Sequence, residues 1–290
     1  MTPRGAGERR ALGGHGLGSR LANMGEMRTT LDAMRTQLLG VARVVFAVAA
    51  VLALPALSFA QVKVLISGGF SAAYREVLPE FERTTGISVS TVSGASQGSG
   101  ADTIEAQLRR GVLADVVIMN RGGLAELIAQ GRIVPGTDVD LAHTLTGMAV
   151  RAGQAKPDIS TVDAFRQALL GAKVVATSGS NTSLVGDILP RLGIADLITV
   201  KVGRYTDSIA MVARGDAALV ILPVSEILGM PGVEFVGTIP TQLQLPSVYA
   251  AAIVAGSKER DTAQRLIAFL FSERATAAIK RSGMEPSQRR

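Results

Sequence analysis

The chain has 290 residues, of which 47% are hydrophobic, and this is enough for one or two domains with complete cores. It contains no Cys and no Trp and only 4% aromatic residues. This excludes disulfides, thiol nucleophiles and thiolate metal sites, and it argues against a surface that stacks nucleic-acid bases. Residues 1–60 hold seven of the 30 basic residues and only three of the 24 acidic ones, so the remainder is close to neutral and its charge indicates no class of partner.

Residues 44–57 form an apolar segment that follows Arg43, and the small residues Ser58 and Ala60 come directly after it. This order predicts a secretory signal peptide that is cleaved after Ala60, so we expect a periplasmic mature protein and a dispensable extension at residues 1–60. A retained membrane anchor is the alternative, but Pro55 interrupts the segment and a spanning helix needs about 20 apolar residues. The start codon stays open among three methionines: Met1, Met27 and Met34.

Residues 61–85 predict a strand, a glycine-rich turn and a helix. The apolar run 62–66 stops at Ser67, and apolar residues then recur at helical spacing (Tyr74, Val77, Leu78 and Phe81). Ser71 occupies the expected N-cap position, while Gly68 and Gly69 lack a Cβ and would let a ligand approach the backbone. Unpaired N–H groups and the helix dipole at this position predict one half of an anion-binding cleft.

Two further strand–turn–helix units follow, and together the three units predict a parallel sheet with helices on its faces. The second unit has a strand at 86–92, a small polar loop at 93–100 and a helix at 103–110. The third has a buried strand at 114–119 and a helix at 124–130.

A second series predicts another lobe, which the chain enters through a strand at 144–150. Helices are expected at 161–170, 184–192 and 207–214, and strands at 173–177, 199–202 and 217–222. Strands at 233–238 and 248–254 and helices at 261–271 and 273–282 then close the chain. We therefore expect an α/β protein with two lobes, each a mixed, mainly parallel sheet flanked by helices. The lobes span 61–143 and 144–247, residues 248–290 return to the first lobe, and a ligand cleft lies between them.

Three polar turns share one chemistry, because each follows a predicted strand and offers hydroxyl and backbone N–H groups without any charged side chain. They are residues 67–71, 93–99 and 178–183. Each turn alone could be a simple connection, but three at the same topological position predict a site for a small anion. The expected ligand-binding residues are Gly69, Phe70, Ser71, Ser96, Ser99, Ser180, Thr182 and Ser183, with Arg121 and Arg204 as possible partners of a carboxylate.

Catalytic signals are few. After residue 60 the sequence has a single histidine, His143, which argues against a catalytic triad and against an imidazole-rich metal site. Glu226 is a candidate base, although a glutamate at a helix start also has a purely structural explanation. Tyr205 and Tyr249 are the other candidate bases. No phosphate-binding or dinucleotide-binding motif is present, so we expect no cofactor, no metal and no nucleic acid as a partner.

Several stretches resemble the periplasmic molybdate-binding-protein-like family, which comprises extracellular solute-binding proteins of ABC importers. They are VKVLISGGFSAAYREVLPEFERTTG, GVLADVVIM, ATSGSNTSLVGDILPRLGI, LPVSEILGMPGVEFVG, VYAAAIVAG and the terminal GMEP. The resemblance covers residues 62–286 and implies a type II periplasmic-binding-protein fold with a cleft that closes on its ligand.

Molybdate binders of this family use two Ser and one Tyr as ligands. The first Ser position falls here on Gly69, the second falls within 96–100, and the Tyr position falls near Leu222, where there is no Tyr. Two of the three positions therefore differ, and the ligand stays open between an oxyanion such as molybdate or tungstate and an organic acid.

Two functions fit these observations. The first is an exported, monomeric solute-binding protein that captures a small anion, either an oxyanion or an organic carboxylate, for an ABC-type importer. Its partner would be the transporter permease, and it would meet the membrane only through its signal peptide. The second is an enzyme that interconverts cis- and trans-aconitate by allylic proton transfer, because a branch similar to this family isomerises aconitate. The second function requires a base within reach of the substrate.

Overall fold

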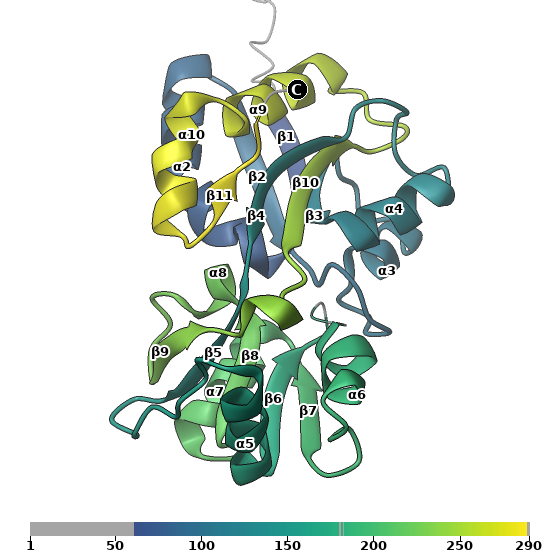
Figure 1. Cartoon of the computed structure of the whole chain (residues 1–290). Coiled ribbons are helices and arrows are strands. Elements are labelled where there is room, and N and C mark those ends of the chain that lie inside the picture. The colour runs from purple at the N-terminus through teal and green to yellow at the C-terminus, as the bar shows by residue number, and fades with distance from the viewer. Residues whose placement is uncertain (1–60, 180, 182, 289–290) are drawn as a thin grey trace, which may run out of the picture. The chain divides into compact units, whose positions relative to one another are not determined.

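The computed structural model describes residues 61–179, 181 and 183–288 (Figure 1). The predicted signal peptide and the candidates Ser180 and Thr182 lie outside the described residues. Within the described part of the chain, every helix is too short or too polar to cross a membrane.

The first sheet has six strands in the order β11-β4-β10-β3-β1-β2. Its parallel strands are β1 (Gln61–Ile66), β2 (Ser88–Ser93) and β3 (Val116–Asn120). The antiparallel strands are β4 (Val139–Thr144), β10 (Ser247–Ile253) and β11 (Glu285–Pro286). The sequence analysis missed β4 and placed one strand at 144–150, whereas the chain breaks at Leu145 and continues as β5 (Thr146–Arg151) in the second sheet.

The second sheet repeats the arrangement of the first, with five strands in the order β7-β6-β8-β5-β9. Its parallel strands are β6 (Val174–Ser178), β7 (Thr199–Gly203) and β8 (Leu219–Pro223). Antiparallel β5 and β9 (Val233–Thr238) complete it, as β10 and β4 do in the first sheet. Both sheets are therefore mixed, and the expected α/β class is confirmed.

Helices cover both faces of the first sheet, because its central strands are apolar on both sides. Val62, Val64 and Ile66 of β1 pack against α2 (Gly68–Thr85), α9 (Arg260–Leu270) and α10 (Glu273–Arg281). Leu65 faces the opposite way, toward α3 (Ile104–Arg109) and α4 (Arg121–Ala129). Figure 1 shows these two layers on either side of the sheet.

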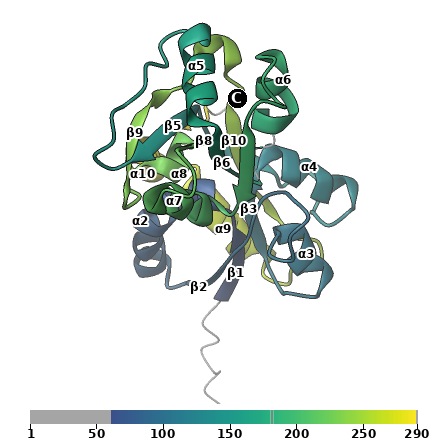
Figure 2. The ribbon, with the colours of Figure 1, turned by 90° about the horizontal axis from the view of Figure 1, so that it is seen from below.

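The second sheet is covered in the same manner. Phe165 of α5 (Val162–Ala172) packs on one face together with the π-helical turn Leu184–Ile188 and α6 (Leu189–Arg191). The other face carries α7 (Tyr205–Arg214) and the single turn α8 (Val224–Ile227). The sequence analysis gave no range for α8, although it considered Glu226 as a residue at a helix start. Figure 2 shows α5 and α7 at different faces of this sheet.

Two helices begin earlier than the sequence suggests. The N-cap of α2 is Ser67 rather than Ser71, so the expected glycine-rich turn is already helix. Ser71 lies inside that helix, where its Oγ donates to the carbonyl of Gly68 at 2.7 Å. Similarly, α4 begins at Arg121, because the Asn120 side chain accepts the Gly123 N–H at 2.8 Å and caps it.

The chain passes between the two sheets twice, and one glutamine joins both passages. Gln244 lies just after the 3₁₀ turn Thr241–Leu243 on the way back to the first sheet. Its side chain accepts the Thr146 N–H and donates to the Thr146 carbonyl, both at 2.9 Å, and it also donates to the Ile239 carbonyl at 3.0 Å. The outgoing and returning segments are therefore held together at one point.

Candidate functional site

A cavity of about 630 Å³ lies at the carboxyl ends of parallel strands from both sheets. Ile66 of β1 and Ser93 of β2 line it from the first sheet, and Ser178 of β6 and Gly203 of β7 line it from the second. This is the position at which open α/β sheets bind ligands, because the strand ends and the following helix N-termini converge there.

The N-terminus of α2 lies at this cavity through Gly68. The first turn of α2 contains no acidic residue, and the buried Ser67 Oγ has no hydrogen-bond partner among the described residues. Free N–H groups and the helix dipole favour negative charge at such a position.

The two glycines at this helix start make room for tyrosine rings. A Cβ on Gly68 would lie 2.4 Å from the Tyr205 ring, and a Cβ on Gly69 would lie 1.8 Å from the Tyr249 hydroxyl oxygen. The sequence analysis expected a ligand to occupy this space. The close approach that glycine permits is instead used by α7 and β10, which bring both tyrosines against α2.

Glu226 is the buried carboxyl of the cavity. It lies in α8, and its Oε2 is 3.4 Å from the Ser178 Oγ. Its Oε1 is close to α2, since it would lie 3.3 Å from a Cβ on Gly68. Burial raises the pKa of Glu226 to about 8, and the hydrogen bond from Ser178 opposes this only in part. Such a carboxyl exchanges its proton near neutral pH, as a general acid or base must.

Tyr249 is buried close to Glu226. Burial raises the pKa of Tyr249 well above its ordinary value, and the negative charge of Glu226 adds to the shift. The Tyr74 hydroxyl, which lines the cavity, exchanges a hydrogen bond of 2.7 Å with Thr91 Oγ1, and burial raises the pKa of Tyr74 to about 12. Both phenols are therefore neutral at pH 7.

Two arginines bring positive charge to the cavity. Arg75 lies on α2, where its Nε donates to the Ser71 carbonyl at 3.2 Å. Arg204 is the N-cap residue of α7, and its Nε lies 3.4 Å from Oδ2 of Asp102. With Glu226 protonated, these two cations outnumber Asp102 and leave the cavity with a net positive charge, which suits an anion.

The structure brings five of the predicted residues to the cavity: Ser71, Ser99, Arg204, Tyr205 and Glu226. Others have partners elsewhere. Phe70 is fully buried in the core, Ser96 Oγ accepts the Asn120 N–H at 3.0 Å, and Ser183 Oγ donates to Asn181 Oδ1 at 3.0 Å. Phe70 therefore packs in the core of the first sheet, and the two hydrogen bonds tie Ser96 and Ser183 to neighbouring parts of the chain.

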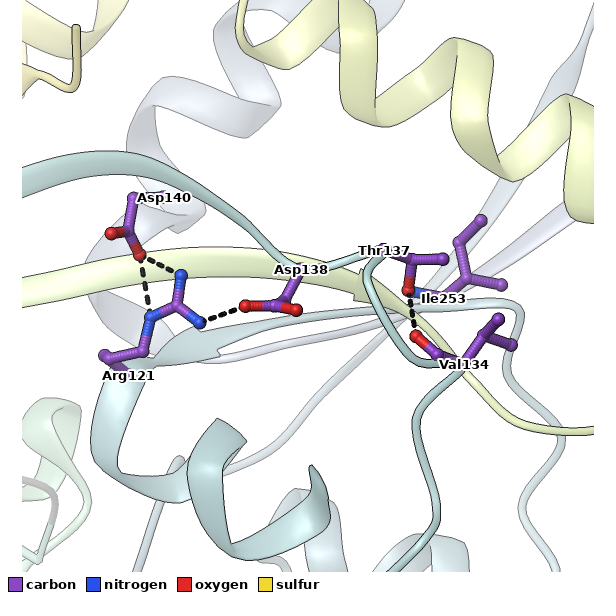
Figure 3. Close-up of polar contacts among 6 residues, drawn as sticks. All are labelled: Arg121, Val134, Thr137, Asp138, Asp140 and Ile253. Atoms are coloured by element: carbon purple, nitrogen blue, oxygen red, sulfur yellow. Dashed lines mark hydrogen bonds and ion pairs between the residues drawn. The ribbon is translucent and has the colours of Figure 1, made fainter. Parts of the chain in front are cut away.

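Arg121 is bound by aspartates instead of facing the cavity (Figure 3). Its guanidinium donates to Asp138 at 2.6 Å and also to Asp140. Both aspartates belong to the segment that leads into and forms β4, and Thr137 of the same segment accepts the Ile253 N–H at 3.1 Å (Figure 3). Arg121 therefore ties α4 to this segment, contrary to the expected role at a ligand carboxylate.

Sequence reasoning missed Arg75 and Asp102. Arg75 follows Ser71 by four residues, so a helix over both places them on one face, and this spacing could have indicated it. Asp102 follows the polar loop that contains Ser99, but nothing in its local sequence indicates that Arg204 approaches it. Among the described residues, no group of three or more His, Cys, Asp and Glu side chains could hold a metal ion.

Comparison with known proteins agrees with this architecture. The family model for the bacterial extracellular solute-binding protein matches residues 62–285. A Pseudomonas sp protein named aconitate isomerase is 37% identical over 227 residues, which cover 77% of this chain and 87% of that protein.

Solved structures share the fold at low identity. The Azotobacter vinelandii periplasmic molybdate-binding protein has a TM-score of 0.61 and 21% identity, covering 78% of this chain and 100% of that one. The sulfate-binding protein SubI from Mycobacterium tuberculosis H37Rv has a TM-score of 0.63 and 19% identity, covering 79% of this chain and 88% of that one. The fold is therefore the type II periplasmic-binding fold, as the resemblance implied, and the chain belongs to the bacterial extracellular solute-binding protein family.

Proposed function

We propose that this protein is an aconitate isomerase, with Glu226 as the group that carries the proton. The single observation that carries the proposal is the buried Glu226 carboxyl in a cavity with two arginines, with a pKa of about 8. The 37% identical protein named aconitate isomerase supports the same choice. Of the two functions that fit the sequence, these observations favour the enzyme.

The chemistry requires only one base. Aconitate carries a methylene group and an alkene CH on either side of its central carbon. Removal of a methylene proton by the Glu226 carboxylate leaves the electron pair delocalised over three carbons and an adjacent carboxylate. Return of the proton to the other end restores the same constitution with the double bond moved, so the geometry can change between cis and trans. A base on one face of the planar carbanion can reach both of its terminal carbons, so the same carboxyl serves as base and then as acid.

Stabilisation of the negative charge in the carbanion falls to the groups around Glu226. The N-terminus of α2 reaches the cavity at Gly68, and Arg75 and Arg204 also line it. Fixed donors and cations of this kind stabilise charge that develops in a transition state more effectively than water does.

The test is conversion of cis-aconitate by the purified mature protein, followed by chromatography of the trans isomer. We expect turnover by the wild type and a loss of about 10²–10⁴-fold in Glu226→Gln, the usual contribution of a general base. Glu234→Gln is the matched control, because Glu234 is an exposed side chain of β9. Wild-type protein without turnover, or full activity in Glu226→Gln, would contradict the proposal.

A second candidate function is capture of a small anion for an ABC importer. Family membership supports it, as does the likeness of the fold to a molybdate-binding protein and a sulfate-binding protein. In that case the protein is a periplasmic monomer with two lobes, the first formed by residues 61–143 and 248–290 and the second by residues 144–247. It binds its ligand between these lobes and delivers it to a permease. Tight binding of molybdate, sulfate or a carboxylate in calorimetry, without turnover of cis-aconitate, would favour this function over the enzyme.

A further inference from the structure

Two charged residues from different sheets meet at the cavity. Asp102 lies between β2 and α3 of the first sheet, and Arg204 lies between β7 and α7 of the second. Their ion pair, at 3.4 Å between Arg204 Nε and Asp102 Oδ2, joins the two connections, and both residues line the cavity.

This ion pair is loose enough to be replaced. The side chains are 51% and 41% exposed, although Oδ2 of Asp102 itself is buried and has no hydrogen-bond partner among the described residues. The contact is longer than an ordinary hydrogen bond. Exposed ion pairs of this kind contribute little to stability. A ligand carboxylate can accept two parallel hydrogen bonds from a guanidinium, which is a stronger arrangement. An incoming carboxylate therefore gains by taking the place of Asp102.

The other cation is placed differently. Arg75 donates to the carbonyl of Ser71 on its own helix, and it takes part in none of the ion pairs formed by the described residues. Binding at Arg75 requires no exchange of partners, whereas binding at Arg204 requires the loss of Asp102. A ligand without a carboxylate that reaches Arg204 leaves the Arg204–Asp102 pair intact. Arg204 then contributes nothing to the affinity for that ligand.

We propose that Arg204 is a specificity-determining residue that binds one carboxylate of a tricarboxylate, and that Asp102 is the partner it gives up for this ligand. Asp102 thus lowers the affinity for every ligand that needs Arg204, and Arg204 supplies the preference for three carboxylates over two. The inference rests on the proposed function for the ligand class, but it concerns binding and not turnover.

The experiment measures binding by calorimetry with three saturated acids that cannot isomerise. Tricarballylate has the three carboxylates of aconitate, whereas glutarate lacks the central carboxylate and succinate lacks one terminal carboxymethyl group. The variants are Arg204→Gln, Asp102→Asn and the double variant. Arg214→Gln is the control, because Arg214 is an exposed arginine of the same helix that pairs with Asp216.

We expect wild-type protein to prefer tricarballylate to both dicarboxylates. Arg204→Gln should weaken the binding of tricarballylate at least tenfold, as expected for loss of a charge-assisted contact to one carboxylate. The same variant should weaken the binding of at least one dicarboxylate by less than about threefold. Asp102→Asn should tighten tricarballylate, and this gain should shrink in the double variant. Arg214→Gln should bind like wild type.

Three results with the variants would overturn the inference. They are unchanged binding in Arg204→Gln, an equal loss for all three acids, or weaker tricarballylate binding in Asp102→Asn. Failure of tricarballylate to bind the wild type would also overturn it. The outcome is separable from the proposed function: selective binding without turnover of cis-aconitate refutes the isomerase alone, whereas turnover with binding unaffected by Arg204→Gln refutes only this assignment.

Discussion

Replacement of Glu226 by Gln should stabilise the protein in a pH-dependent manner. The folded-state pKa of Glu226 is about 8, against an ordinary value of 4.5, because the carboxylate loses its hydration on burial. A raised pKa means that the folded state holds the proton more tightly than the unfolded state does. The associated stability is fully present below pH 4.5 and is lost as the pH rises from there to about 8.

The magnitude follows from the size of this window. Each pKa unit corresponds to about 1.4 kcal/mol, so the wild type loses roughly 3 kcal/mol between pH 4.5 and pH 7 relative to a neutral Gln at the same site. For a domain of this size, such a difference raises Tm by about 6–12 °C. We therefore expect Glu226→Gln and wild-type protein to melt at similar temperatures near pH 5, and the variant to melt higher at pH 7 and above.

The assay is thermal unfolding of wild type, Glu226→Gln and the exposed-site control Glu234→Gln at pH 5, 7 and 9, followed by circular dichroism. Because Glu234 is 46% exposed, its variant should track the wild type at all three values. Melting curves of Glu226→Gln that run parallel to the wild type across this range would show that the carboxylate is solvated. The pKa of Glu226 would then lie near its ordinary value, and the assignment of Glu226 as the base would lose its support.

Three further outcomes are expected. The kcat/KM for cis-aconitate should rise with pH and level off above about pH 8, because the base must be ionised, so a rate already constant from pH 5 would exclude Glu226 as that base. Gly69→Ala should lower the free energy of unfolding in urea by about 1–3 kcal/mol, because the new Cβ would lie 1.8 Å from the Tyr249 hydroxyl oxygen. Adding Tyr249→Phe, which removes that oxygen, should restore part of the lost stability. Gln244→Ala should lower the free energy of unfolding in urea by about 1–3 kcal/mol, because it leaves the Thr146 N–H at the crossing without the side-chain acceptor, and unchanged stability would show that water replaces it.

The sequence predicted the fold well because the strands are marked locally. Apolar runs such as 62–66 and 217–222 are followed by polar turns, and this pattern located the parallel strands of both sheets. Strand β4 was missed because its sequence, VDLAHT, alternates too weakly to indicate a strand, and it depends on pairing with β10. Helix starts were placed late because glycine at the first turn suggested a loop, whereas Ser67 and Asn120 begin the helices.

The candidate site was predicted less completely, because it depends on contacts between distant residues. Glu226 was named as a candidate base, but only the structure shows its burial beside Ser178. Gly69 was expected to face a ligand, and the ring that fills its space belongs to Tyr249, far along the chain. Arg121 was assigned to a ligand because no local pattern indicates that Asp138 and Asp140 bind it.

The place of β10 in the first sheet governs when that sheet can be completed. β10 lies between β3 and β4, although it is formed by Ser247–Ile253 and follows every strand of the second sheet in the chain. Until these residues have left the ribosome, the edges of β3 and β4 that pair with β10 have no hydrogen-bond partner. The second sheet, formed by a continuous stretch of chain, can assemble first. A chain that ends before residue 253 can therefore complete the second sheet, whereas the first sheet lacks all or part of the central strand β10.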